Sequence, residues 1–168
     1  MDTIFALASA PGKAGISIVR LSGPLAINVA EKLTKSKLKE KQPNLRVIYD
    51  SDKQFIDQAL ILIFSKPCSF TGENVVEFHL HGSSAVVSSV IKLLGNFKGL
   101  RSAEAGEFTR CALENGKIDL AQVEGLADLI DAETDAQHKQ AARIFNGALG
   151  QKTKEWRAKL VKAGALLV

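Results

Sequence analysis

The chain has 168 residues, 46% of them hydrophobic, and its 22 Lys and Arg residues against 18 Asp and Glu residues give a net charge of +4. This apolar content excludes a disordered chain, and no apolar run reaches the roughly 18 residues that a membrane-spanning helix needs. Two cysteines are too few for a disulfide framework, so a reducing, cytoplasmic setting without membrane contact is expected.

The first 118 residues predict a mixture of strands and helices in irregular order. Short β-branched or alternating runs predict strands at residues 3–8, 16–21, 45–50, 54–64, 73–80 and 99–103. Apolar residues at helical spacing, with Gly and Pro at the ends, predict helices at residues 25–35, 84–96 and 107–115. A turn is expected from His81 to Ser84. This order predicts an α+β fold, a mixed β-sheet with packed helices, rather than repeated βαβ units.

From Asp119 onward the apolar period is helical. A first helix is expected to carry an apolar stripe at Leu120, Val123, Ala127 and Ile130. A second helix is expected over residues 137–168, with Gly147 and Gly150 as possible kink points. We therefore expect two domains, residues 1–118 and residues 119–168. The amphipathic helix of the second needs a partner for its apolar side, so residues 119–168 are either the first long α-helices of a truncated helical domain or cover that side by self-association.

The positive charge is concentrated in one short run. Residues 32–41 contain five lysines and one glutamate, which equals the whole net charge of the chain. Such a run usually indicates a solvated loop. A contact with nucleic-acid phosphate is the alternative, although no aromatic residue is interleaved there to stack on a base.

The sequence lacks the motifs of several enzyme classes. It has no GxxxxGK[ST] phosphate loop, no GxGxxG, no HExxH, no GxSxG and no CxxC. His79 and His81 would face the same side of a strand, but no further ligands complete a metal site. Neither a catalytic residue nor a metal site is therefore expected in this stretch of chain.

Three ordered segments carry a resemblance to a known family: residues 10–23, residues 69–82 with the sequence SFTGENVVEFHLHG, and residues 105–131 beginning with AGEFTR. Together they resemble the N-terminal region of the tRNA modification GTPase family called MnmE or TrmE. The chain departs from the family pattern at Ala10, Ser83 and Ala105, where the family has Pro, Gly and Pro. These departures lie in turns and concern loop geometry.

The resemblance implies an N-terminal domain that binds tetrahydrofolate and forms a homodimer. That domain is similar in fold to the folate-binding domain of the glycine cleavage T-protein, and a helical domain carrying an inserted GTPase domain follows it. The family protein works with the flavoprotein MnmG (GidA) to modify C5 of the wobble uridine in tRNA, using a one-carbon unit from folate. GTP, Mg and K are expected to bind the full-length protein and not this chain, which would lack the GTPase domain.

The family's folate ligands align with Arg20, Glu77 and Lys117. The cofactor would be a 5-formyl- or methylene-tetrahydrofolate. A carboxylate such as Glu77 accepts the paired N–H groups of a reduced pterin, and a cation suits the carboxylates of the folate tail. The sequence leaves open whether Arg20 or Lys117 meets that tail. Secondary candidates, in a loop that either lines the ligand or only turns the chain, are Phe70, Thr71, Gly72 and Glu73.

Two other functions remain as alternatives. One is a stand-alone, folate-dependent aminomethyltransferase related to T-protein, although such enzymes are longer than this chain. The other is a non-enzymatic scaffold that binds tRNA or a protein partner, with residues 32–41 as its contact. Salt-dependent retention of tRNA would favour the scaffold.

Overall fold

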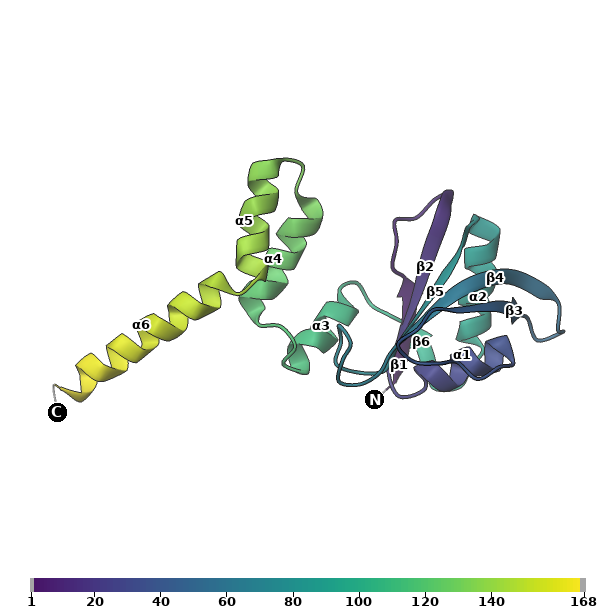
Figure 1. Ribbon diagram of the computed structural model, residues 1–168, viewed down its shortest axis with the longest axis horizontal. Coiled ribbons are helices and arrows are strands. Elements are labelled where there is room, and N and C mark those ends of the chain that lie inside the picture. The colour runs from purple at the N-terminus through teal and green to yellow at the C-terminus, as the bar shows by residue number, and fades with distance from the viewer. Residues whose placement is uncertain (1, 167–168) are drawn as a thin grey trace. The chain divides into compact units, whose positions relative to one another are not determined.

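The computed structural model describes residues 2–166, and the chain divides into two compact units between Ala112 and Leu113 (Figure 1). The first unit is α+β, and the second is entirely helical in its regular structure. The α+β prediction with a mixed sheet is confirmed. No helix in residues 2–166 combines the length and the apolar character that crossing a bilayer demands.

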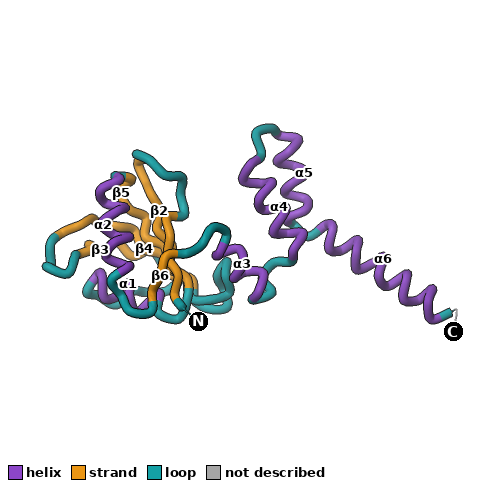
Figure 2. The backbone as a smooth tube through the Cα atoms, turned by 180° about the vertical axis from the view of Figure 1, so that it is seen from behind, coloured by secondary structure: helices purple, strands orange, loops and turns teal. Residues whose placement is uncertain are grey.

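The first unit is built on one six-stranded sheet (Figures 1 and 2). Its strands are β1 (Thr3–Leu7), β2 (Ala14–Ser22), β3 (Asn44–Tyr49), β4 (Phe55–Phe64), β5 (Val75–Gly82) and β6 (Leu100–Ser102). They lie in the order β3-β4-β5-β2-β1-β6, and only the β1–β6 pair of these neighbours is parallel. Because the strands alternate their side chains between two faces, the register decides which residues share a face.

Two helices cover one face of this sheet, α1 (Ala26–Thr34) and α2 (Ser84–Gly95) (Figure 2). The core beneath them joins alternate strand residues such as Val19, Phe78 and Ile61 to Leu33 of α1 and Leu94 of α2. Burial of these large apolar side chains is the main stabilising contribution in this unit. The opposite face holds the intervening residues of β2, β4 and β5, and several apolar side chains are exposed there.

Strand β5 continues further than the sequence predicts. His81 and Gly82 belong to the strand, and the turn expected at these residues is wrong. The buried carboxylate of Asp57 accepts hydrogen bonds from the His81 backbone N–H, at 2.9 Å, and from the Gln58 backbone N–H. A Cβ atom at Gly82 would overlap the backbone of Ala14, so glycine allows β2 to remain close to the end of β5.

The second unit contains the helices α4 (Leu120–Asp131), α5 (Asp135–Phe145) and α6 (Ala148–Ala165), and α3 (Glu107–Glu114) crosses the division between the units. Capping boxes at Asp119 and Thr134 fix the starts of α4 and α5. Gly125 lets these two helices approach closely, because a Cβ there would meet the backbone of Phe145.

One helical prediction needs correction. The single helix expected over residues 137–168 is wrong, because the chain breaks between α5 and α6 at Gly147, which has a φ of 84°. Only glycine adopts this left-handed conformation at low cost. In α4, Leu120 and Ile130 of the expected apolar stripe are exposed, whereas Gly125 is buried.

Candidate functional site

Arg20 and Glu77 form an ion pair on the sheet face opposite α1 and α2. They are direct cross-strand neighbours on β2 and β5. Arg20 Nε donates a 2.8 Å hydrogen bond to Glu77 Oε1, and Arg20 Nη2 lies 2.7 Å from the same oxygen. The side chains are 28% and 14% exposed, so the pair is largely shielded but reachable from solvent. The structure thus brings together two of the three predicted folate ligands.

Two phenyl rings lie close to the Arg20 guanidinium. Its Cζ atom is 6.0 Å from the ring centre of Phe70 and 5.5 Å from that of Phe108. Both distances allow a cation–π attraction, which restricts the guanidinium to one position. Phe70 was a secondary candidate from the sequence. Phe108 was missed, and the signal for it was its place in the AGEFTR motif that carries the resemblance.

The loop that follows Phe70 is anchored to the end of β2. Ser22 Oγ lies 2.7 Å from Thr71 Oγ1 and donates a 2.9 Å hydrogen bond to Glu73 Oε2. Gly72 has a φ of 78°, and its N–H donates to the Ser69 carbonyl. Thr71 and Gly72 are buried. These contacts give Thr71, Gly72 and Glu73 a clear role in shaping the loop that positions Phe70.

His79 lies two residues along β5 from Glu77 and therefore on the same face. Its Nε2 atom is 3.5 Å from Glu77 Oε2, too far for a good hydrogen bond. This nitrogen is shielded from solvent and has no hydrogen-bond partner among the described residues. From the sequence, His79 was considered only as a metal ligand. The signal for a different role was its two-residue spacing from Glu77 in an alternating strand.

A hollow of about 490 Å³ adjoins this row of side chains. Leu62, the β4 neighbour of Glu77, lines it together with Phe64, Pro43 and the residues around Lys41 and Lys66. The volume is within the range of small-ligand sites. The hollow therefore reaches Leu62, the cross-strand neighbour of Glu77, although Glu77 itself does not line it.

Lys117 belongs to the second unit, where it is exposed in the bend between α3 and α4. The first unit contains Arg20 and Glu77 but not this lysine. The assignment of Lys117 to the folate site therefore stays a prediction.

Glu107 fixes the start of the helix that carries Phe108. Its carboxylate is 4% exposed and accepts a bidentate pair of hydrogen bonds from Arg101, at 2.6 and 2.9 Å. It also accepts from Arg110, at 3.0 Å, and from the Glu104 backbone N–H, at 2.7 Å. The contacts with Arg101, and then those with the Glu104 N–H and Arg110, outweigh burial and lower the pKa of Glu107 to about 2. This network ties α3 to β6 beside the candidate site.

Some lysines of residues 32–41 make contacts within the first unit. Lys37 Nζ lies 2.8 Å from Glu31 Oε2, and this contact lowers the pKa of Glu31. Lys35 ends α1, and its Nζ lies 4.2 Å from the ring centre of Tyr49. Intramolecular contacts thus account for two of the five lysines.

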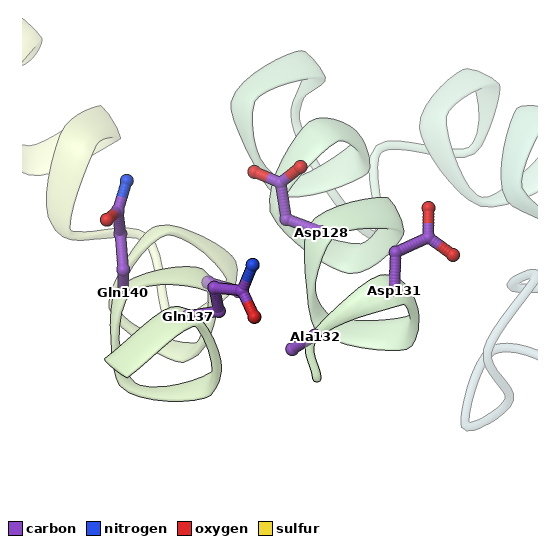
Figure 3. A pocket seen from close by; sticks show the side chains of 6 residues that line it. Asp128, Asp131, Ala132, Gln137 and Gln140 are labelled. Atoms are coloured by element: carbon purple, nitrogen blue, oxygen red, sulfur yellow. The ribbon is translucent and has the colours of Figure 1, made fainter. Parts of the chain in front are cut away.

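A separate hollow in the second unit has no connection to the predicted ligands. It encloses about 280 Å³ between α4 and α5, and Figure 3 shows Asp128, Asp131, Gln137 and Gln140 around it. Across residues 2–166, no group of three or more His, Cys, Asp and Glu residues is placed to hold a metal ion. The candidate functional site is therefore the group of side chains around Arg20 and Glu77.

Comparison with known proteins gives the family. The pattern described as "GTP-binding protein TrmE N-terminus" matches residues 3–117, and the one described as "MnmE helical domain" matches residues 120–168. The chain belongs to the MnmE (TrmE) family. It is 59% identical over 167 residues to the tRNA modification GTPase MnmE of Roseobacter denitrificans and 56% identical to that of Ruegeria pomeroyi.

Both matches to MnmE proteins cover 99% of this chain and 39% of the relative. The chain thus spans about two fifths of the length of these curated relatives. The resemblance recognised from the three sequence motifs is confirmed. The MnmE patterns meet near residue 118, whereas the compact units divide after Ala112, so a domain boundary at residue 118 stays a prediction.

Proposed function

We propose that this chain is the folate-binding and dimerising part of a tRNA modification GTPase. The observation that carries the proposal is the largely shielded Arg20–Glu77 pair on one face of the sheet, with the rings of Phe70 and Phe108 close to the Arg20 guanidinium. Family membership supports the tRNA-modifying role, since the relatives are named tRNA modification GTPases. The stand-alone aminomethyltransferase and the scaffold have no comparable support.

The residues present fit a reduced folate. Glu77 accepts a pterin N–H group, and Arg20 holds that carboxylate in one orientation. The phenyl rings of Phe70 and Phe108 lie close to the Arg20 guanidinium, and the low exposure of the pair strengthens its hydrogen bonds. The hollow next to Leu62 gives room for the part of the ligand beyond the pterin. When bound, the tetrahydrofolate derivative supplies the one-carbon unit.

The folate tail requires a cation other than Arg20. Arg20 directs two nitrogens at Glu77, so its charge is already partnered within the sheet. Lys117, which aligns with the family's third folate ligand, is therefore the residue proposed to meet the tail carboxylates. This choice selects one of the two assignments that the sequence left open.

Dimerisation through the first unit is the second part of the proposal. Apolar side chains on the face that α1 and α2 leave uncovered support it: Leu45, Leu60 and Phe64 are 57%, 37% and 38% exposed. Leu45 and Leu60 are direct neighbours on β3 and β4. Burying such a surface against a second copy is favourable, because each apolar side chain removed from water contributes to association.

The full-length protein would act in the cytoplasm with the flavoprotein MnmG on C5 of the wobble uridine of tRNA. Its GTPase domain would bind GTP with Mg and K, in a part of the protein that this chain does not span. These parts of the proposal follow from the family resemblance.

Calorimetric titration of the chain with 5-formyl-tetrahydrofolate tests the central claim. We expect saturable binding with one ligand per chain. Absence of binding heat with both 5-formyl-tetrahydrofolate and tetrahydrofolate would reject folate binding. Retention of tRNA in place of folate, lost when the lysines of residues 32–41 are neutralised, would instead favour the scaffold.

A further inference from the structure

The two carboxylate oxygens of Glu77 have different surroundings. Oε1 accepts a 2.8 Å hydrogen bond from Arg20 Nε and lies 2.7 Å from Arg20 Nη2, so the guanidinium contacts this oxygen with both nitrogens. Oε2 accepts no defined hydrogen bond from the described residues, and it faces His79. Arg20 thus contacts Oε1, and Oε2 is the oxygen of Glu77 that is left to accept from a ligand, whereas a reduced pterin offers two adjacent N–H donors.

His79 Nε2 lies where the second acceptor is needed. It is 3.5 Å from Glu77 Oε2, and it is a buried polar atom without a hydrogen-bond partner in residues 2–166. Leaving such an atom unsatisfied is costly, so buried orphans deserve a chemical explanation. A neutral imidazole with its proton on Nδ1 accepts at Nε2. Two acceptors at this separation suit two N–H groups on neighbouring atoms of one ligand.

The neighbours of His79 keep its ring in this position. Ile18 on β2 and Leu60 on β4 are its direct cross-strand partners, one on each side. These apolar side chains offer no competing hydrogen bond to the ring. The histidine side chain is 22% exposed but Nε2 itself is shielded, so a ligand N–H reaches Nε2 only when the side chains that cover this atom move aside.

We propose that His79 is a ligand-binding residue whose Nε2 accepts one pterin N–H while Glu77 Oε2 accepts the adjacent one. This inference rests on the proposed folate function and assigns a residue outside the Arg20, Glu77 and Lys117 set. It makes Arg20 a positioning residue, because its contacts with Oε1 direct the ligand to Oε2 and His79.

Three variants test the role of His79 in calorimetric titrations with 5-formyl-tetrahydrofolate at pH 8. His79→Phe keeps a ring but removes the acceptor, and we expect binding about tenfold weaker. His79→Gln restores an acceptor at similar reach and should bind within about threefold of the original chain. His81→Phe is the matched control, because His81 lies on the same strand, is exposed and is held by Asp57.

Nitrogen NMR of the imidazoles gives a readout that a structural role would not move. Ligand addition should shift the unprotonated Nε2 signal of His79 upfield, with the signals of His81 unchanged. Unchanged affinity in the His79→Phe variant overturns the inference. An unmoved His79 signal in the original chain at saturation also overturns it, and this readout remains valid if the variants unfold. If the original chain binds no 5-formyl-tetrahydrofolate, the proposed function fails and this inference fails with it.

Discussion

Arg20 and Glu77 are 57 residues apart in sequence and directly opposite each other in the sheet, with both Arg20 contacts made to a single Glu77 oxygen. Such a pair holds each partner in one orientation. It also means that loss of either side chain leaves the other charge partly shielded and without its partner.

Glu77→Ala is expected to weaken binding of 5-formyl-tetrahydrofolate by about tenfold or more, because the carboxylate that accepts a pterin N–H group is lost. Calorimetric titration measures the change. Glu31→Ala is the control, since Glu31 is also paired with a cation but lies on α1. Equal affinities of Glu77→Ala and the original chain would remove Glu77 from the site.

Lys117→Gln is expected to weaken folate binding only for ligands that carry the glutamyl tail, because the lysine pairs with the tail carboxylates. Titrations with 5-formyl-tetrahydrofolate and with a reduced pterin lacking the tail make the comparison. Lys159→Gln in α6 serves as the control for a general loss of positive charge. A loss of affinity that is the same for both ligands would contradict the tail assignment.

Light scattering at tens of micromolar is expected to give twice the 18.1 kDa mass of one chain. Phe64→Glu should shift the chain toward the monomer, because it places a charge on the apolar open face of the sheet. Ile130→Glu is the control, since Ile130 is 75% exposed but lies on α4. A monomeric original chain would count against dimerisation, and a dimer unaffected by Phe64→Glu would place the interface elsewhere.

Glu107→Gln should destabilise the first unit by about 2 kcal/mol at pH 7, since partial exposure of the arginine partners reduces the effect below that of a fully buried pair. The pKa of Glu107 falls from 4.5 unfolded to about 2 folded. Its contribution is therefore fully present above pH 4.5 and disappears as the pH falls toward 2. Calorimetric unfolding should show a gap between variant and original chain that narrows below pH 4.5.

Glu104→Gln is the matched control for that experiment. Glu104 is 69% exposed and its carboxylate is 3.3 Å from Arg110. It should change stability by less than about 0.5 kcal/mol. A gap for Glu107→Gln that does not depend on pH would show that the ionised carboxylate is not the source of stability.

The sequence predicted the strands and helices of the first unit well, because their signals are local. Alternation of apolar and polar residues predicted β2 and β5. Apolar residues at helical spacing predicted α2, with Leu94 on its buried side. The extension of β5 through His81 was missed because it depends on Asp57, which is 24 residues away in the chain. The break at Gly147 was anticipated only as a kink, since a glycine alone does not show whether the helix continues.

The candidate site was predicted in part. The family motifs identified Arg20 and Glu77, but nothing local in the sequence shows that they bind each other, because that contact follows from the pairing register of β2 and β5. Phe108 reaches Arg20 through the fold of the segment between β6 and α3. The shielding of His79 Nε2 depends on side chains from neighbouring strands, which a single strand pattern does not contain.

The side chain of Asp57 closes the sheet where β4 begins and β5 ends. Its carboxylate binds the backbone N–H of His81, the ring Nδ1 of His81 at 2.7 Å and the N–H of Gln58. The last step between β4 and β5 is thus closed by a side chain rather than by a peptide group. Asp57→Asn would leave one acceptor oxygen in place of two. This change in one side chain would therefore loosen the ends of both β4 and β5 without altering the main chain.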